Sequence, residues 1–192
     1  NAFYTAFKNS NDKKTSCEAK LNLIYDAYLS GGELESELLL SLNDTNSWEG
    51  MIVSSFLEKK EGSYQKALET FLNSSKIPAT YPLLTDKIQT QFDLKEQTFY
   101  LADLYLCTQQ YEMARDLIDQ SAPSLLQKEP RALFLYGKSY LYEANDQPID
   151  QALSSYLLAF ETFCRVPLWQ SELQSIKLEI LNHYEKTLTL FI

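Results

Sequence analysis

The sequence contains few of the residues that interrupt helices: its 192 residues include only 5 glycines and 6 prolines. All-β sandwiches and barrels need Gly- and Pro-rich turns between many short strands. The scarcity of both residues therefore disfavours an all-β fold and favours helices joined by short turns. No stretch approaches the roughly 18 consecutive apolar residues of a membrane-spanning helix, so we expect no membrane partner on this ground.

Cysteine and histidine are too few and too scattered for metal or redox chemistry. The three cysteines, Cys17, Cys107 and Cys164, include no Cys-x-x-Cys pair, and His183 is the only histidine. A structural zinc site needs closely spaced Cys and His ligands. We therefore expect no metal and no disulfide, and we predict three buried free thiols. Reduced cysteines indicate a cytoplasmic or nuclear compartment.

Basic residues are outnumbered: 17 Lys and Arg stand against 26 Asp and Glu, which gives a formal net charge of -9. An acidic surface repels the phosphates of nucleic acids and of anionic membranes. We therefore expect no nucleic acid partner. The charge favours a protein or peptide partner that is neutral or basic.

Catalytic signatures are also missing. The five glycines are dispersed and form no phosphate-binding loop, and no cysteine or serine lies at the spacing of an activated nucleophile. The carboxylates are spread along helical stretches, as solvated charge usually is. We expect a protein that is not an enzyme and that needs no cofactor.

What the sequence does contain is a repeated unit between residues 96 and 163. One copy covers Phe99–Gln120 and the next covers Arg131–Phe163, and each has an apolar helix, a short polar turn and a second apolar helix. Glycine inside a helix costs about 1 kcal/mol relative to alanine, so the glycine in the second copy indicates a close approach of two helices. The small residues that we expect to meet in pairs are Ala102 with Ala114 and Gly137 with Ala152.

The two copies are offset by 35 residues, and their pattern resembles the tetratricopeptide repeat, a helix-turn-helix unit that recurs about every 34 residues. The second copy has three extra residues, which we place in a longer turn over Glu143 to Pro148. The resemblance implies an all-α fold: a right-handed solenoid of antiparallel helix hairpins, with about three repeats and flanking helices. The matching positions are Ala102, Tyr105, Tyr111, Ala114 and Ile118 in the first copy, and Gly137, Tyr140, Ala152, Tyr156 and Ala159 in the second.

We predict a single domain over residues 1–192. In the degenerate repeat of this domain, Ser55 stands where Ala102 and Gly137 stand, and Glu58 replaces the aromatic residue. The predicted segments are N-terminal helices in 1–46, the degenerate repeat in 47–78, an insertion in 79–95, repeats in 96–130 and 131–167, and a capping or next-repeat helix in 168–192.

The first helices of tetratricopeptide repeats line a concave surface, so the resemblance implies a groove for a partner segment. Aromatic side chains beside a few charges are typical of interaction hot spots. The alternative is that the aromatic residues pack against a neighbouring helix. The groove residues predicted in this way are Phe99, Asp103, Leu106, Arg131, Phe134, Lys138, Leu141 and Tyr142.

One subclass of the family grips the carboxyl-terminal tails of chaperones with Lys, Asn and Arg on these helices. In this chain only Lys138 has a suitable charge at the corresponding places, and Asp103 has the opposite charge. We therefore expect no clamp of that kind.

Residues Phe99–Leu158 also resemble the amino-terminal repeats of the tetratricopeptide subunits of the anaphase-promoting complex, which self-associate through such repeats. The resemblance implies a protein–protein interaction scaffold in a larger assembly, with a homodimer as one form. The alternative is a transport or secretion chaperone that cradles a client peptide. A stable homodimer in light scattering would favour the assembly subunit.

Overall fold

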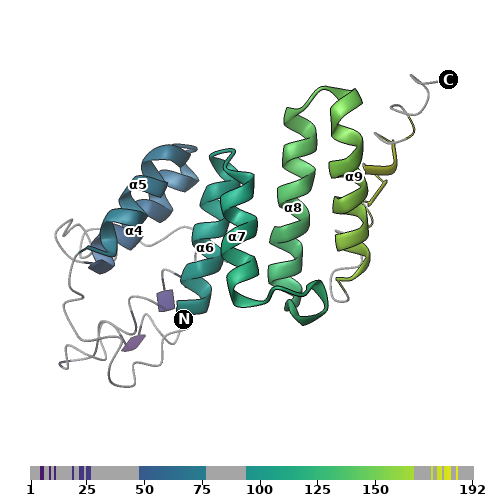
Figure 1. Ribbon diagram of the computed structural model, residues 1–192. Helices are drawn as coiled ribbons and strands as arrows, with labels where there is room; N and C mark the ends of the chain where they lie inside the picture. Colours follow the sequence, from purple (N-terminus) through teal and green to yellow (C-terminus); the bar gives the residue numbers. More distant parts are fainter. Residues whose placement is uncertain are drawn as a thin grey trace. The chain divides into compact units, whose positions relative to one another are not determined.

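The computed structural model describes residues 48–76 and 94–166, together with single residues between 5 and 26 and between 174 and 185. The regular structure of this part of the chain is helical and includes no strand, which confirms the predicted all-α class (Figure 1). The elements are α4 (Trp48–Lys60), α5 (Tyr64–Ser74), α6 (Leu94–Cys107), α7 (Tyr111–Ser121), the short 3-10 helix η1 (Leu125–Gln127), α8 (Pro130–Asp146) and α9 (Ile149–Cys164).

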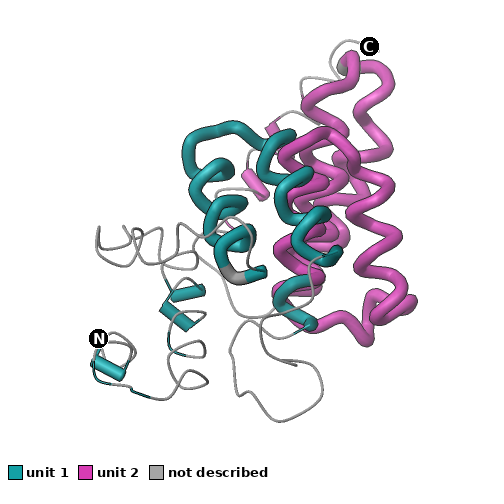
Figure 2. The backbone as a smooth tube through the Cα atoms, turned by 90° about the vertical axis from the view of Figure 1, so that its left-hand side faces the viewer, with its two compact units in different colours: residues 1–97 teal, residues 98–192 magenta. Residues whose placement is uncertain are grey.

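The chain divides into two compact units, residues 1–97 and residues 98–192 (Figure 2). The boundary falls in the first turn of α6, so most of that helix belongs to the second unit. Helices α4 and α5 belong to the first unit, and α7, α8 and α9 belong to the second. The single domain predicted from the sequence therefore contains two units, each with its own packed helices.

In the first unit, α4 and α5 form the hairpin expected of the degenerate repeat. The turn is closed by two backbone hydrogen bonds, from Ser63 to the carbonyl of Glu58 (2.8 Å) and from Gly62 to the carbonyl of Lys59 (3.0 Å). Gly62 has a φ of 79°, a left-handed conformation that glycine adopts without steric cost. Across the hairpin, the buried Ser55 hydroxyl donates to the carbonyl of Ala67 at 2.8 Å. The two helices therefore approach closely at small residues.

The turn between α6 and α7 has the same construction. Gln110 donates to the carbonyl of Tyr105 at 2.8 Å and Gln109 to that of Leu106 at 3.2 Å. Gln109 takes the left-handed φ of 60° that Gly62 takes in the other hairpin. The two positions are 47 residues apart, as are Ser55 and Ala102.

Helices α8 and α9 also form an antiparallel hairpin, and its turn is shorter than the one predicted from the sequence (Figure 1). The predicted turn over Glu143 to Pro148 is wrong, because α8 continues through Asp146 and only Gln147 and Pro148 connect the helices. Glu143 and Ala144 favour helix. The residue before a proline is displaced from helical geometry, and Gln147 is indeed extended, with φ -97° and ψ 153°.

Gly137 marks the close approach of α8 to α9, as predicted, but its neighbour is different. A Cβ atom at Gly137 would lie 2.7 Å from Cε1 of Phe163, a ring that is fully buried on α9. The predicted pairing of Gly137 with Ala152 is therefore wrong. Around this contact lies the core of the hairpin, which also includes Ile180 from beyond α9: Leu133, Leu141, Ala144, Ala152, Tyr156, Ala159, Phe163, Val166 and Ile180.

Other predictions are tested in part. Cys107 and Cys164 are free thiols, but Cys107 is only partly buried and Cys164 is exposed, so the prediction of buried thiols is wrong for Cys164. Cys164 is the last residue of α9 and is not a member of the core cluster that contains its neighbour Phe163. Cys17, the insertion up to residue 93 and most of the predicted N-terminal and C-terminal helices lie outside the described residues.

Candidate partner-binding surface

The eight predicted groove residues all lie on α6 and α8 within the second unit, and we call this set the α6/α8 face. Nζ of Lys138 lies 3.7 Å from Oδ1 of Asp103, although 35 positions separate the two residues. The guanidinium of Arg131 lies 5.5 Å from the centre of the Phe99 ring. Residues at or near equivalent positions of the two sequence copies are therefore neighbours in space.

Lys138 is the centre of this face. Its ammonium lies 5.6 Å from the centre of the Phe134 ring and 5.2 Å from the centre of the Tyr142 ring. Phe134, Lys138 and Tyr142 follow one another at intervals of four residues, and this spacing places them in a row along one side of α8. Both distances are within the range of about 6 Å over which cations are attracted to aromatic faces.

The charge of Lys138 is maintained by its surroundings. Burial would lower the pKa of its ammonium group, but the Asp103 carboxylate and the Tyr142 hydroxyl raise the pKa above its ordinary value. Lys138 therefore stays protonated at neutral pH. It acts as a fixed positive charge and hydrogen-bond donor, not as a nucleophile or base.

The predicted residues divide into a buried and a partly exposed group. Phe99, Leu106 and Leu141 are 3%, 2% and 6% exposed, so they pack between helices and do not offer a surface to a partner. The alternative interpretation, packing, thus accounts for Phe99. The partly exposed residues are Asp103, Arg131, Phe134, Lys138 and Tyr142.

Phe134 connects the face to the core behind it. Its ring lies 6.0 Å from the ring of Phe163, with an interplanar angle of 52°. Phe163 in turn fills the space opposite Gly137. One side of Phe134 is therefore held by the α8/α9 core, and the Lys138 ammonium lies over its ring.

A second set of contacts, which the sequence reasoning missed, joins α7 to α8. The Tyr111 hydroxyl donates to Asp146, and Arg115 donates to Glu143 at 2.8 Å while its guanidinium lies 4.6 Å from the centre of the Tyr140 ring. Tyr111 begins the second helix of the first copy and Asp146 ends the first helix of the second copy, so the alignment of the two copies gave no signal for this pair. These contacts engage Glu143 and Asp146 with α7.

Lys128 fixes the connection between α7 and α8. Its side chain is fully buried, and its ammonium donates to Asp119 at 2.7 Å and to the carbonyl of Ala122 at the end of α7. The same ammonium lies 4.8 Å from the centre of the Tyr136 ring, and the Tyr136 hydroxyl donates to Asp119 at 3.2 Å. This cluster is satisfied internally, which indicates a structural role.

The α6/α8 face presents the Lys138 ammonium beside two aromatic rings, Phe134 and Tyr142. Within the residues that the structure describes, no group of three His, Cys, Asp or Glu side chains is placed to hold a metal ion. None of the described helices has the length and apolar character needed to cross a membrane.

None of the protein-family models, curated proteins or solved structures with which the chain was compared matches it. The resemblance to tetratricopeptide repeats therefore depends on the pattern of the sequence alone.

Proposed function

We propose that this chain is a non-enzymatic protein-interaction module of tetratricopeptide-like hairpins that binds a segment of a partner protein on the α6/α8 face, as part of a larger assembly. The observation that carries the proposal is the contact between Asp103 and Lys138, 35 residues apart. Stacked repeats bring equivalent positions of successive first helices together. The contact is therefore the one expected if the two sequence copies are stacked repeats.

The composition of the face supports the same function. Phe134 and Tyr142 are partly exposed and flank a charged group, and aromatic residues beside charge are frequent at the centres of protein interfaces. Phe134 and Tyr142 are also packed against the hairpin core, so little side-chain entropy would be lost on binding.

A quantitative capture experiment tests the proposal. The tagged chain is compared with a Tyr142→Ala variant and with a Met113→Ala control, since Met113 is an exposed apolar residue on α7. Truncation of an aromatic anchor commonly costs about 2 kcal/mol, roughly thirtyfold in affinity. We expect partners to be lost from Tyr142→Ala and retained by Met113→Ala, with both variants folded by circular dichroism. Equal recovery from all three chains would contradict the proposal.

A further inference from the structure

We propose that the loop joining α7 to α8, residues 122–129, is a second docking site, whose Leu126 side chain inserts into an apolar pocket of a folded partner domain. We call these residues the α7–α8 loop. The loop lies outside the α6/α8 face, but it leads directly into the first turn of α8, where Arg131 belongs to that face (Figure 1). The loop and the face are therefore neighbouring parts of the second unit.

The α7–α8 loop is longer than the connections inside the hairpins. Helix α7 ends at Ser121 and α8 begins at Pro130, which leaves eight residues between them, whereas two or three residues join the helices of each hairpin. Every ordered residue loses backbone conformational entropy. A connection of this length therefore keeps one conformation only where its own contacts compensate for that loss.

The loop makes such contacts at its start and at its end. The Ser124 hydroxyl accepts from the backbone N–H of Leu126 at 3.3 Å, and the Ser124 carbonyl accepts from the N–H of Gln127 at 3.0 Å. These bonds close the short helix η1. After it, the fully buried Lys128 ammonium donates to Asp119 of α7 at 2.7 Å. Both ends of η1 are therefore fixed to the second unit.

The two leucines of η1 have opposite surroundings. Leu125 is partly buried and packs against the core of the α8/α9 hairpin. Leu126 is 84% exposed, the largest exposed fraction among the large apolar side chains of the residues that the structure describes. Single exposed leucines are common on protein surfaces. Leu126 differs in that its backbone is already held in place, so its burial by a partner would cost little further conformational entropy.

The shape of this feature favours a folded protein as the partner. A projecting side chain is enclosed only by a concave surface, and such pockets are built from side chains of several elements of a fold. A short extended segment offers no pocket of this kind. A membrane surface fits less well, because peripheral binding needs a continuous apolar helix face and is opposed at anionic lipids by the net charge of -9.

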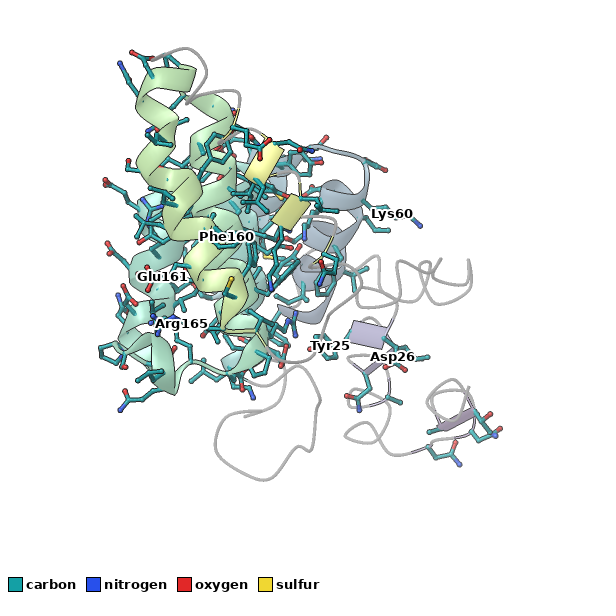
Figure 3. The ribbon with its side chains drawn as sticks, turned by 90° about the vertical axis from the view of Figure 1, so that its right-hand side faces the viewer. Tyr25, Asp26, Lys60, Phe160, Glu161 and Arg165 are labelled. Carbon is teal, nitrogen blue, oxygen red and sulfur yellow. The ribbon has the colours of Figure 1, made fainter. Side chains whose placement is uncertain are left out.

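Site-specific crosslinking tests this inference. A diazirine analogue of leucine replaces Leu126 in the full chain or, as a matched control, Leu157, and the cells that naturally produce the chain are irradiated. Leu157 is 47% exposed on α9, one turn before Glu161, which is labelled in Figure 3. We expect a protein adduct from position 126 and none from position 157. Mass spectrometry should place the crosslink on apolar residues of one folded domain.

Calorimetry with that domain then measures the contribution of the side chain. Leu126→Ser should weaken binding about tenfold or more, because the burial of a leucine side chain is lost. Leu126→Met should lose less, since methionine fills a similar volume, and Leu157→Ser should bind like the unchanged chain. Leu126 is exposed in the free chain, so Leu126→Ser should leave the free energy of unfolding almost unchanged.

Three results would overturn the inference. The first is no adduct from position 126, or the same adducts from both positions. The second is cosedimentation with vesicles of phosphatidylcholine and phosphatidylserine that is lost in Leu126→Ser, which would identify a membrane as the partner. The third is unchanged affinity of Leu126→Ser for the crosslinked domain. The proposed function is decided separately, because Tyr142→Ala alters the α6/α8 face and leaves the α7–α8 loop intact.

Discussion

Replacing Gly137 with alanine tests the packing that supports the α6/α8 face. The new Cβ atom would lie 2.7, 2.9 and 3.0 Å from Cε1, Cζ and Cδ1 of Phe163. The Phe163 ring is fully buried and lies 6.0 Å from the Phe134 ring, so any movement of the ring would disturb other packed side chains. Overpacking of this kind costs about 1–3 kcal/mol, and three contacts at or below 3.0 Å argue for the upper end.

The same substitution also has a favourable effect, since alanine is better than glycine inside a helix by about 1 kcal/mol. We therefore expect Gly137→Ala to lower the free energy of unfolding by about 2 kcal/mol in total. In a Phe163→Leu background the aromatic ring atoms are gone. There, Gly137→Ala should be neutral or should stabilise by up to about 1 kcal/mol.

Urea denaturation of the four chains in this cycle, followed by circular dichroism, measures the coupling between the two positions. Gly62→Ala is the control, because a Cβ there meets nothing within 4 Å and any loss comes from its φ of 79°. Its cost should be the same with Phe or Leu at position 163. If Gly137→Ala is equally harmless, or equally harmful, in both backgrounds, the proposed contact with Phe163 is not what requires glycine.

Four further outcomes are expected. Gln109→Gly should stabilise the chain by about 1 kcal/mol in thermal or urea unfolding, because Gln109 has a φ of 60° that glycine adopts without strain; a loss of stability would contradict this. Asp119→Ala should lower the free energy of unfolding by roughly 2–3 kcal/mol, because it leaves the buried Lys128 ammonium without its carboxylate. Lys128→Met should cost less in the same urea denaturation, and a larger cost for Lys128→Met than for Asp119→Ala would contradict this reasoning. Burial and, after it, the hydrogen bond with Tyr140 raise the pKa of Tyr136 in the folded state. The stability from this shift should therefore be fully present below about pH 10, the unfolded tyrosine value, and should fall as the pH rises above it. In urea titrations at several pH values, Tyr136→Phe should weaken that fall. Cys164 should react rapidly with a thiol reagent in the native chain, because it is exposed; slow reaction would show that it is covered.

Sequence reasoning predicted the features that depend on local interactions. The helix-turn-helix unit predicted over Phe99–Gln120 corresponds to α6 and α7, and the degenerate repeat predicted in 47–78 contains α4 and α5. Asp103 and Lys138 were both predicted to line the groove, and the structure places them 3.7 Å apart, a contact that the sequence analysis did not state. Whether the hairpins form a right-handed solenoid remains a prediction.

The errors concern interactions that only tertiary packing decides. The three extra residues of the second copy extend α8 instead of lengthening the turn, because helix propensity up to Asp146 is stopped only by Pro148. That extension shifts the register of the hairpin, so Gly137 meets Phe163 in place of Ala152. The burial of Phe99 could not be inferred from its position on one side of the predicted helix, because an internal helix can be covered on both sides.

Site-specific photo-crosslinking tests the central claim, that the α6/α8 face contacts a partner protein, most directly. A photoreactive phenylalanine analogue replaces Tyr142 on the face or, as a control, the exposed Met113 on α7, and the chain is irradiated in the cells that produce it. We expect a discrete covalent adduct with another protein from position 142 and none from position 113. An adduct from position 113 alone, or the same adducts from both positions, would contradict the claim.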